Sequence, residues 1–287
     1  MAPPPDDPLV SYDFSSWINR LLGVVKRSGK RMTAIVLLGG LLPAIGVVAT
    51  WVGIGFGIAY LLTEVLDQPD EFTPLTVVVI IAYYVSMLTV IGYFAATSTL
   101  AMIRVATNDA AGQGISLSRA YFSSTRLAWP TFGWSVLGGL LTLLGVLLCY
   151  LPGLYVSLVL SVLAPVMAFQ RRSGLVGAFR LVHSDFWPTI GRLVLLAFAV
   201  SVLSMGTLIG LYVLGIGVGF VTISVAGESA LDTVGPIYLV VAAIVYFAVI
   251  LFAQVLSTAG SLVTYAGARA RQEPGLNTGR LVAEVNA

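Results

Sequence analysis

The sequence predicts an all-α integral membrane protein with six transmembrane helices in three hairpins, each hairpin preceded by an amphipathic interfacial helix. Three observations predict this class. Of the 287 residues, 58% are hydrophobic and 10% are charged, whereas about a quarter of a soluble domain is charged. The apolar residues form runs longer than the roughly 20 residues that cross a bilayer, without the alternation of a porin-type barrel. Finally, the loops alternate between basic and acidic.

Six stretches without charge mark the predicted spans. They cover residues 33–63, 75–103, 131–150, 152–169, 193–226 and 235–267. The first and fifth are too long for an upright crossing, because a helix rises about 1.5 Å per residue. We therefore expect the first to bend at Pro43 and the fifth to bend within the glycine-rich stretch 206–219.

The loop charges give the orientation, because Lys and Arg concentrate on the cytoplasmic side of membrane proteins. With the N-terminus in the cytoplasm, all 15 basic residues lie inside, while the outside loops carry acidic residues only. The chain is thus expected in the plasma membrane, multi-pass, with both termini cytoplasmic. The inside basic residues are Arg20, Lys26, Arg27, Lys30, Arg31, Arg104, Arg119, Arg126, Arg171, Arg172, Arg180, Arg192, Arg269, Arg271 and Arg280.

The ends of the chain are predicted to lie outside the membrane domain. Residues 1–11 are expected to be a disordered tail, 12–270 a single transmembrane domain, and 271–287 a cytoplasmic tail. The N-terminus does not resemble a cleaved signal peptide, so the first span is expected to be retained. Cys149 is the only cysteine, which excludes an internal disulfide and predicts a packing role near the outer end of the third span.

Two cytoplasmic segments share an amphipathic pattern and the same ending. Residues 113–130 and 174–188 mix apolar, aromatic and basic side chains, and each reaches a Trp-Pro-Thr motif at Trp129 or Trp187. Tryptophan favours the headgroup level and proline favours the first turn of a helix, so the motif predicts a corner between an in-plane helix and a span. With residues 12–31, this gives three repeat-like units: 12–103, 114–170 and 174–267.

A family resemblance rests on this middle region. Tyr-Leu-Pro-Gly-Leu-Tyr-Val-Ser-Leu at 150–158, Leu-Ala-Pro-Val-Met-Ala at 163–168 and Ala-Phe-Arg leading to Phe-Trp-Pro within 174–191 resemble the core of the glycerophosphodiester phosphodiesterase membrane-domain family and its uncharacterised six-span bacterial and archaeal relatives. The likeness is best over residues 114–200. It implies a six-span architecture and no activity, because the soluble phosphodiesterase domain to which family members are fused does not occur here.

Catalytic and metal-binding patterns do not occur in the sequence. It contains one histidine, His183, and its carboxylates are scattered over loops without the spacing of metal ligands. There is no nucleophile elbow and no phosphate-binding loop of the Walker type. We therefore predict no enzyme, no cofactor and no metal. We also expect no nucleic-acid partner, because the net charge is only +2 and its basic residues lie against a membrane.

Two groups of residues are the predicted functional positions. His183 and Asp185 are expected to form a polar network with Arg180 and Arg192, with a proton-linked switch as the alternative. The residues predicted to anchor the protein to the interface or to anionic headgroups are Arg119, Arg126, Trp129, Arg171, Arg172, Arg180, His183, Trp187 and Arg192. The residues predicted to permit helix packing or bends are Pro43, Pro152, Gly153, Pro165, Gly206, Gly210, Gly215 and Gly219.

Two functions remain open at this point. The first is a non-enzymatic module that organises lipids or partner proteins through its basic interfacial helices, with anionic membrane lipids and a membrane protein or a second copy as partners. The second is a transporter or permease-like subunit for a lipid or small amphiphile, although its spans contain no ionisable residue. A wide cavity lined by Ser, Thr and Tyr would favour transport, and a solid interior with a groove over the basic helices would favour the organiser.

Overall fold

The computed structural model describes residues 7–60 and 74–287 apart from residue 172. Regular structure in these residues is helical, and six helices are long and apolar enough to cross a membrane, as predicted. The elements are α1 (Phe14–Ile35), the π-helical η1 (Val36–Leu41), α2 (Leu42–Tyr60), α3 (Pro74–Ala110), α4 (Leu117–Leu148), α5 (Tyr150–Ser161), α6 (Leu163–Phe169), α7 (Gly174–Ser184), α8 (Phe186–Ala226), the 3₁₀ turn η3 (Glu228–Ala230), α9 (Leu231–Gln272) and α10 (Thr278–Asn286).

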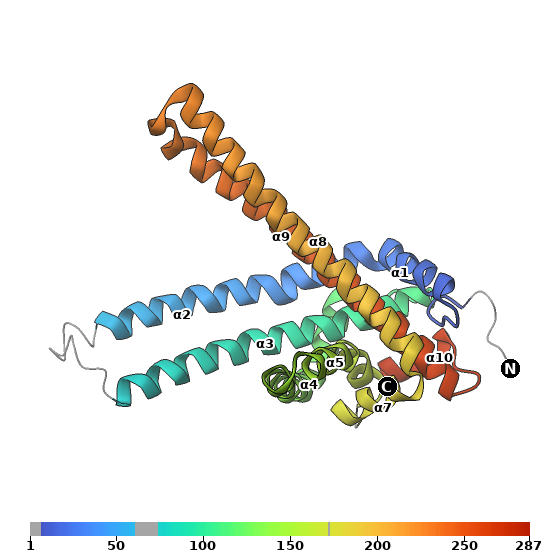
Figure 1. Cartoon of the computed structure of the whole chain (residues 1–287). Helices are drawn as coiled ribbons and strands as arrows, with labels where there is room; N and C mark the ends of the chain where they lie inside the picture. The colour runs from blue at the N-terminus through green and yellow to red at the C-terminus, as the bar shows by residue number, and fades with distance from the viewer. Residues whose placement is uncertain (1–6, 61–73, 172) are drawn as a thin grey trace.

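The long helices project in pairs from one end of the molecule (Figure 1). α2 lies beside α3, α4 beside α5, and α8 beside α9. The α8–α9 pair leaves at a wide angle to the α2–α3 pair, so the two pairs diverge. We call residues 200–250 the arm. Most of its large apolar side chains are exposed, as expected of helices whose solvent is lipid.

The end from which the pairs project is the base, which we define as α1, α6, α7, α10 and the adjoining ends of α3, α4, α8 and α9. Most of the buried residues lie here. Trp17 is buried and its Nε1 donates to Oγ1 of Thr264 at 3.0 Å, while Phe169 stacks on the buried Tyr265 with ring centroids 5.1 Å apart. Burying each such side chain contributes about 1.5–3 kcal/mol, so the base holds the fold together.

Both ends of the described chain belong to this base. The Asp7 carboxylate accepts hydrogen bonds from the backbone N–H of Leu9 (3.0 Å), Val10 (2.8 Å) and Thr278 (2.9 Å) and from the Thr278 hydroxyl (2.7 Å). Leu9 and Val10 are buried, and α10 buries Leu281 among the core side chains. Burial raises the pKa of Asp7, but these hydrogen bonds outweigh it and hold the pKa below its usual value.

The predicted tails are therefore corrected. Residues 7–11 and 278–286 are part of the folded domain, because the Asp7 side chain and the apolar face of α10 bring the two ends together. The part of the predicted N-terminal tail at residues 1–6 lies outside the described residues. Composition alone missed this arrangement because the partners are 271 residues apart in sequence.

The first long helix changes direction at η1, between α1 and α2 (Figure 1), directly before Pro43. In a regular helix the Gly39 carbonyl would accept from residue 43, but proline has no N–H. The Tyr121 hydroxyl donates to this carbonyl instead, at 2.7 Å. A Cβ on Gly39 would lie 2.7 Å from Cδ2 of Tyr121, so only glycine admits the ring. The bend predicted at Pro43 is present, and Tyr121 stabilises it.

α4 and α5 are joined by the single extended residue Cys149, which is exposed. Gly145 and Gly153 face each other across the turn: a Cβ on Gly145 would lie 2.8 Å from the backbone nitrogen of Gly153. Pro152 occupies the first turn of α5, where its missing N–H is tolerated. The packing role predicted for Gly153 thus has a specific partner. The packing role predicted for Cys149 is wrong, because its side chain is exposed.

The fourth span is broken near Pro165. α5 ends at Ser161 and α6 begins at Leu163, with Val162 between them at φ −96° and ψ 0°. Pro165 lies in the first turn of α6, a position that needs no donor from its nitrogen. Sequence analysis expected a helix break at this proline, and the structure places it three residues earlier.

The two Trp-Pro motifs have different structures. α7 ends before Asp185 and α8 begins at Phe186, so Pro188 lies in the first turn of a new helix, as the motif predicts. α4, by contrast, continues through Pro130 without interruption. Residues 117–130 are thus not a separate helix. Proline is tolerated there at the cost of one hydrogen bond, while the adjacent Thr131 hydroxyl donates to the Leu127 carbonyl at 2.7 Å.

The bend expected in the fifth span is also absent. α8 is one helix of 41 residues, about 60 Å long, and continues through the glycine-rich stretch. A Cβ on Gly215 would lie 2.9 Å from the ring of Tyr238 on α9, so this glycine does permit close packing. Gly206, Gly210 and Gly219 have no neighbour within 4 Å of that position, so the predicted close approach is not made there within the chain.

Candidate functional site

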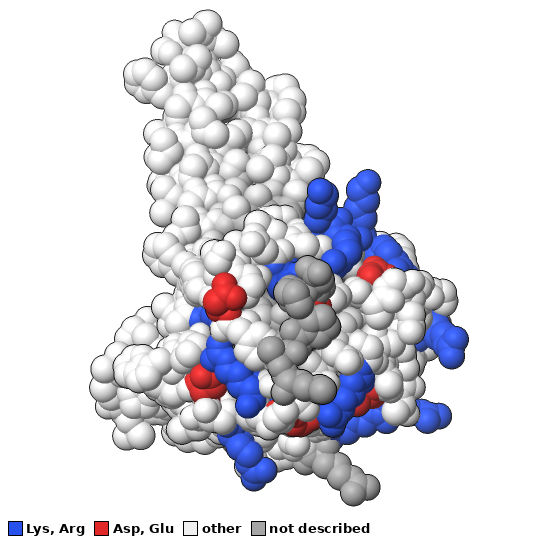
Figure 2. Space-filling view, turned by 90° about the vertical axis from the view of Figure 1, so that its right-hand side faces the viewer, with Lys and Arg blue, Asp and Glu red and all other residues white. Residues whose placement is uncertain are grey.

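Positive charge gathers on the base (Figure 2). In that view Lys and Arg surround the base, with Asp and Glu among them, and the arm above them shows neither. The sequence explains the division, since no Lys or Arg occurs between Arg192 and Arg269. A membrane protein normally keeps such an end in the cytoplasm.

Most of the predicted anchoring residues lie on the surface of the base. The side chains of Arg119, Arg126, Arg171 and Arg180 are exposed. Trp129 is 57% exposed and packs against Tyr93, whereas Trp187 is 80% exposed. Arg172 lies outside the described residues. Free guanidinium groups beside exposed indoles are typical of a surface that meets lipid headgroups.

Arg192 is an exception. It is 2% exposed, and its guanidinium donates to the backbone carbonyls of Tyr12 (3.0 Å) and Asp13 (3.3 Å). The prediction that Arg192 contacts headgroups is therefore wrong. Its physical role is to fix the segment before α1 against α8, because a buried guanidinium must donate to protein acceptors.

The predicted network around His183 is also different. His183 Nδ1 lies 3.0 Å from the Tyr155 hydroxyl and 3.0 Å from the Phe179 carbonyl, and within the described chain it makes no hydrogen bond with Arg180 or Arg192. Asp185 forms an ion pair with Arg271 near the end of α9. The aromatic ring of Phe186 packs against the imidazole and the phenol. His183 therefore belongs to an aromatic cluster at the α7–α8 corner, and the ion pair closes this corner against α9.

A polar cavity of about 420 Å³ opens in the base, and we call it the Arg180 cavity. Arg180 makes no hydrogen bond or ion pair with any residue that the structure describes. Guanidinium, amide and hydroxyl donors suit an oxyanion such as a phosphate. The cavity is lined by Trp134 of α4, Gln170 and Ser173 before α7, Val176, Gly177, Arg180 and Leu181 of α7, and Gln272 of α9.

A glycine positions α7 on this cavity. Gly174 begins α7 at φ +48°, a conformation that other residues rarely adopt. A Cβ at this position would lie 2.7 Å from Nε1 of Trp134. The indole thus packs directly on the backbone of Gly174, and this contact holds the cavity wall formed by α7 against α4.

Sequence analysis missed a charged cluster at the end of α9. The guanidinium of Arg269 is 7% exposed and donates to both carboxylate oxygens of Glu273, at 3.0 and 3.1 Å, and to Glu284 of α10. Glu284 and Glu273 also pair with Arg280. The four-residue spacing of Arg269 and Glu273 could have predicted this ion pair from the sequence, since residues four apart share one helix face. The cluster attaches α10 to α9.

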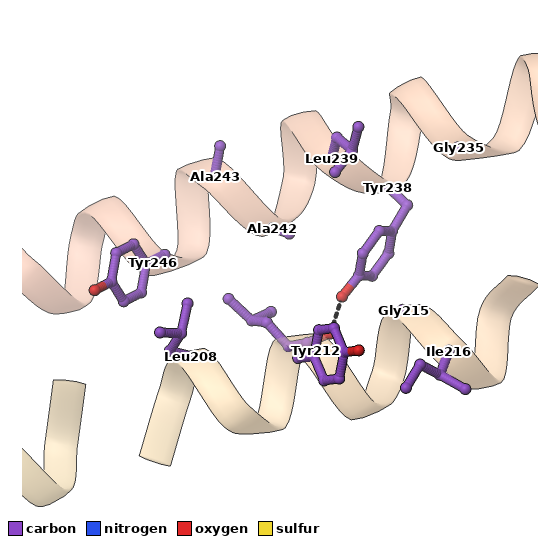
Figure 3. A pocket seen from close by; sticks show the side chains of 11 residues that line it. Leu208, Tyr212, Gly215, Ile216, Gly235, Tyr238, Leu239, Ala242, Ala243 and Tyr246 are labelled. Carbon is purple, nitrogen blue, oxygen red and sulfur yellow. Dashed lines mark hydrogen bonds between the residues drawn. The ribbon is translucent and has the colours of Figure 1, made fainter. Parts of the chain in front are cut away.

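An apolar cavity of about 620 Å³ lies in the arm (Figure 3). Tyr238 reaches from α9 to α8 and its hydroxyl donates to the carbonyl of Leu211. Tyr212, Tyr246 and several aliphatic residues complete the lining. Its surface has almost no hydrogen-bonding capacity beyond the tyrosine hydroxyls, which suits lipid acyl chains better than a polar solute.

A smaller cavity of about 250 Å³ lies beside η1, between α3 and α9. It is mostly apolar, with Ser98, Thr99 and Gln254 as its polar side chains. The Ser98 hydroxyl donates to its own helix, at the Phe94 carbonyl, whereas the exposed Gln254 amide makes no side-chain hydrogen bond within the described chain. An amide at this depth can bind the polar end of an amphiphile.

The described residues contain no group of three His, Cys, Asp or Glu side chains placed to bind a metal ion. Comparisons with protein-family models, with curated proteins and with solved structures find no match for the chain.

Proposed function

We propose that this protein crosses the cytoplasmic membrane six times, with both termini in the cytoplasm, and binds anionic lipids at its base. In this arrangement the three helix pairs are membrane hairpins, and α1 and α7 lie at the interface. It acts as a non-enzymatic module that holds lipids or a partner protein at the membrane. We also propose that it belongs with the glycerophosphodiester phosphodiesterase membrane-domain family, on the motifs quoted above.

The observation that carries the functional proposal is the Arg180 cavity. It joins a free guanidinium to amide and hydroxyl donors on the base, where Lys and Arg gather (Figure 2). Each basic residue near an anionic bilayer contributes about 1 kcal/mol. The exposed Arg119, Arg126, Arg171 and Arg180 therefore contribute about 4 kcal/mol together, which is enough to enrich anionic over zwitterionic lipid. A tightly packed base with a groove over α7 is what an organiser of lipids requires.

Native mass spectrometry of the detergent-extracted protein tests this proposal. We expect phosphatidylglycerol to be retained in preference to phosphatidylcholine, and the Arg180→Gln variant to retain less. Arg280→Gln is the matched control, because it removes the same charge from a half-exposed position that is paired with Glu273 and Glu284. A bare monomer without lipid or partner, or equal retention by both variants, would contradict the proposal.

The second candidate is a carrier for a lipid or small amphiphile. The cavity beside η1 favours it, because π-helical turns often occur at functional sites and Gln254 supplies a polar group among apolar walls. Reconstitution into liposomes with a fluorescent phospholipid distinguishes the two. A carrier moves the probe between leaflets and loses this activity in Gln254→Leu, whereas the organiser binds lipid without moving it.

A further inference from the structure

One buried arginine in the base has no acceptor among the residues that the structure describes. Arg104, near the cytoplasmic end of α3, is 5% exposed, yet its side chain makes no hydrogen bond or ion pair with a residue that the structure describes. Four other buried or half-buried arginines each donate to at least one acceptor. Arg192 donates to backbone carbonyls, Arg269 to two glutamates, and Arg31 and Arg271 to Asp109 and Asp185.

The polar groups on the turn after Arg104 and on α10 bond to other residues. Asn108, one turn later, donates to the Arg104 backbone carbonyl at 2.8 Å, and its amide oxygen accepts from Asn286 of α10 at 3.0 Å. Oδ1 of Asp109 is paired with Arg31, whereas its Oδ2 is buried without a hydrogen-bond partner, and the carboxylate of Glu284 on α10 is paired with Arg269 and Arg280. Within the part of the chain that the structure describes, no carboxylate forms an ion pair with the Arg104 guanidinium.

A second positive charge makes the arrangement less favourable still. Arg171, in the turn after α6, is close enough for its charge to act on Arg104, and α6 packs against α3. A guanidinium that is shielded from most of the solvent and has no anionic partner is unfavourable, and a like charge beside it adds repulsion. Both costs are removed if an anion lies between the two guanidinium groups.

We propose that Arg104 and Arg171 form a binding site for a phosphate group, presented by an anionic lipid headgroup or as free phosphate. Arg104 provides the buried contact and Arg171 covers the site from the exposed side. Two guanidinium forks match the oxygens of a phosphate better than any single lysine would. For the lipid source, the inference rests on the proposed function. The site uses different arginines from the Arg180 cavity.

The test measures thermal unfolding of the delipidated full-length protein in dodecyl maltoside. The probes are sodium phosphate against sodium chloride at equal ionic strength, and mixed micelles with dioleoylphosphatidylglycerol against dioleoylphosphatidylcholine. An anion that binds only the folded protein raises the melting temperature in proportion to its occupancy. We expect protection of the wild type by phosphate, by phosphatidylglycerol or by both, and the responding probe identifies the source.

The variants are Arg104→Met and Arg171→Gln. Arg280→Gln is the matched control, because Arg280 is half-exposed and pairs with Glu273 and Glu284. Loss of one charge-assisted contact should weaken the protecting anion about tenfold or more, while Arg280→Gln keeps this protection. Arg171 is exposed, so its variant remains informative if Arg104→Met fails to fold. The inference is overturned if neither probe protects the wild type, or if the folded variants are protected equally well. If Arg180→Gln loses bound lipid while Arg104→Met and Arg171→Gln keep their protection, the proposed function stands. Only the site at Arg104 and Arg171 is then overturned.

Discussion

The bend at η1 gives the sharpest prediction about stability. Replacing Gly39 by alanine places a methyl group 2.7 Å from Cδ2 of Tyr121, whereas carbon atoms normally approach to about 3.5–4.0 Å. Relief requires a displacement of about 1 Å by the tyrosine ring, which also donates to the Gly39 carbonyl. Overpacking of this kind costs about 1–3 kcal/mol. We therefore expect Gly39→Ala to lower the melting temperature in detergent by several degrees.

The control is Gly46→Ala in α2 of the same long helix, where no atom lies within 4 Å of the new methyl group. This change should be neutral or slightly stabilising, because alanine favours helix over glycine by about 1 kcal/mol. Tyr121→Phe should cost about 1–3 kcal/mol by leaving the Gly39 carbonyl without its donor. In the double variant Gly39→Ala/Tyr121→Ala, the steric term should vanish. Equal melting temperatures for Gly39→Ala and Gly46→Ala, or strict additivity in the double variant, would refute the reasoning.

Three further predictions concern the base and the hairpin turn. Asp7→Asn should lower the melting temperature at neutral pH. Because folding lowers the pKa of Asp7, the wild type is more stable than the variant above the ordinary carboxyl pKa of about 4, and this difference disappears as pH falls below it. Melting curves recorded against pH measure this. Arg269→Met should cost about 1–3 kcal/mol, because it leaves two partly buried carboxylates with Arg280 alone as their partner. Half-exposed Arg280→Gln should cost less than about 1 kcal/mol in chemical denaturation. Gly153→Ala should prevent close packing of α4 and α5, because its Cβ would lie 2.7 Å from a backbone nitrogen, whereas the Cβ of Gly139→Ala meets open space. Equal expression levels and equal melting temperatures for the two variants would contradict this prediction.

The class of fold and the number of spans were predictable because they depend on local composition. A run of about 20 apolar residues must be helical in lipid, wherever the rest of the chain lies. The breaks at Pro43 and Pro165 follow from the missing N–H of proline and were predicted for the same reason. Pro130 shows the limit of this argument, since α4 continues through it.

The base was less predictable because it depends on contacts between distant residues. The bonds from Asp7 to Thr278 and from Arg192 to Tyr12 join segments that share no local pattern. Arginines were therefore assigned to the surface by composition, and the structure buries Arg104 and Arg192. Of the residues that line the Arg180 cavity, only Arg180 was predicted, because a charge on an amphipathic helix is a local signal.

Cysteine labelling of intact cells tests most directly whether the charged base faces the cytoplasm. The native Cys149 is exposed at the α4–α5 turn, which lies at the opposite end of α5 from α6 and the base. We predict that a membrane-impermeant maleimide reaches Cys149 from outside. A cysteine replacing exposed Val176 of α7, in a chain with Cys149→Ser, should react only after permeabilisation. Labelling of both positions from the same side, or in the reverse order, would contradict the account.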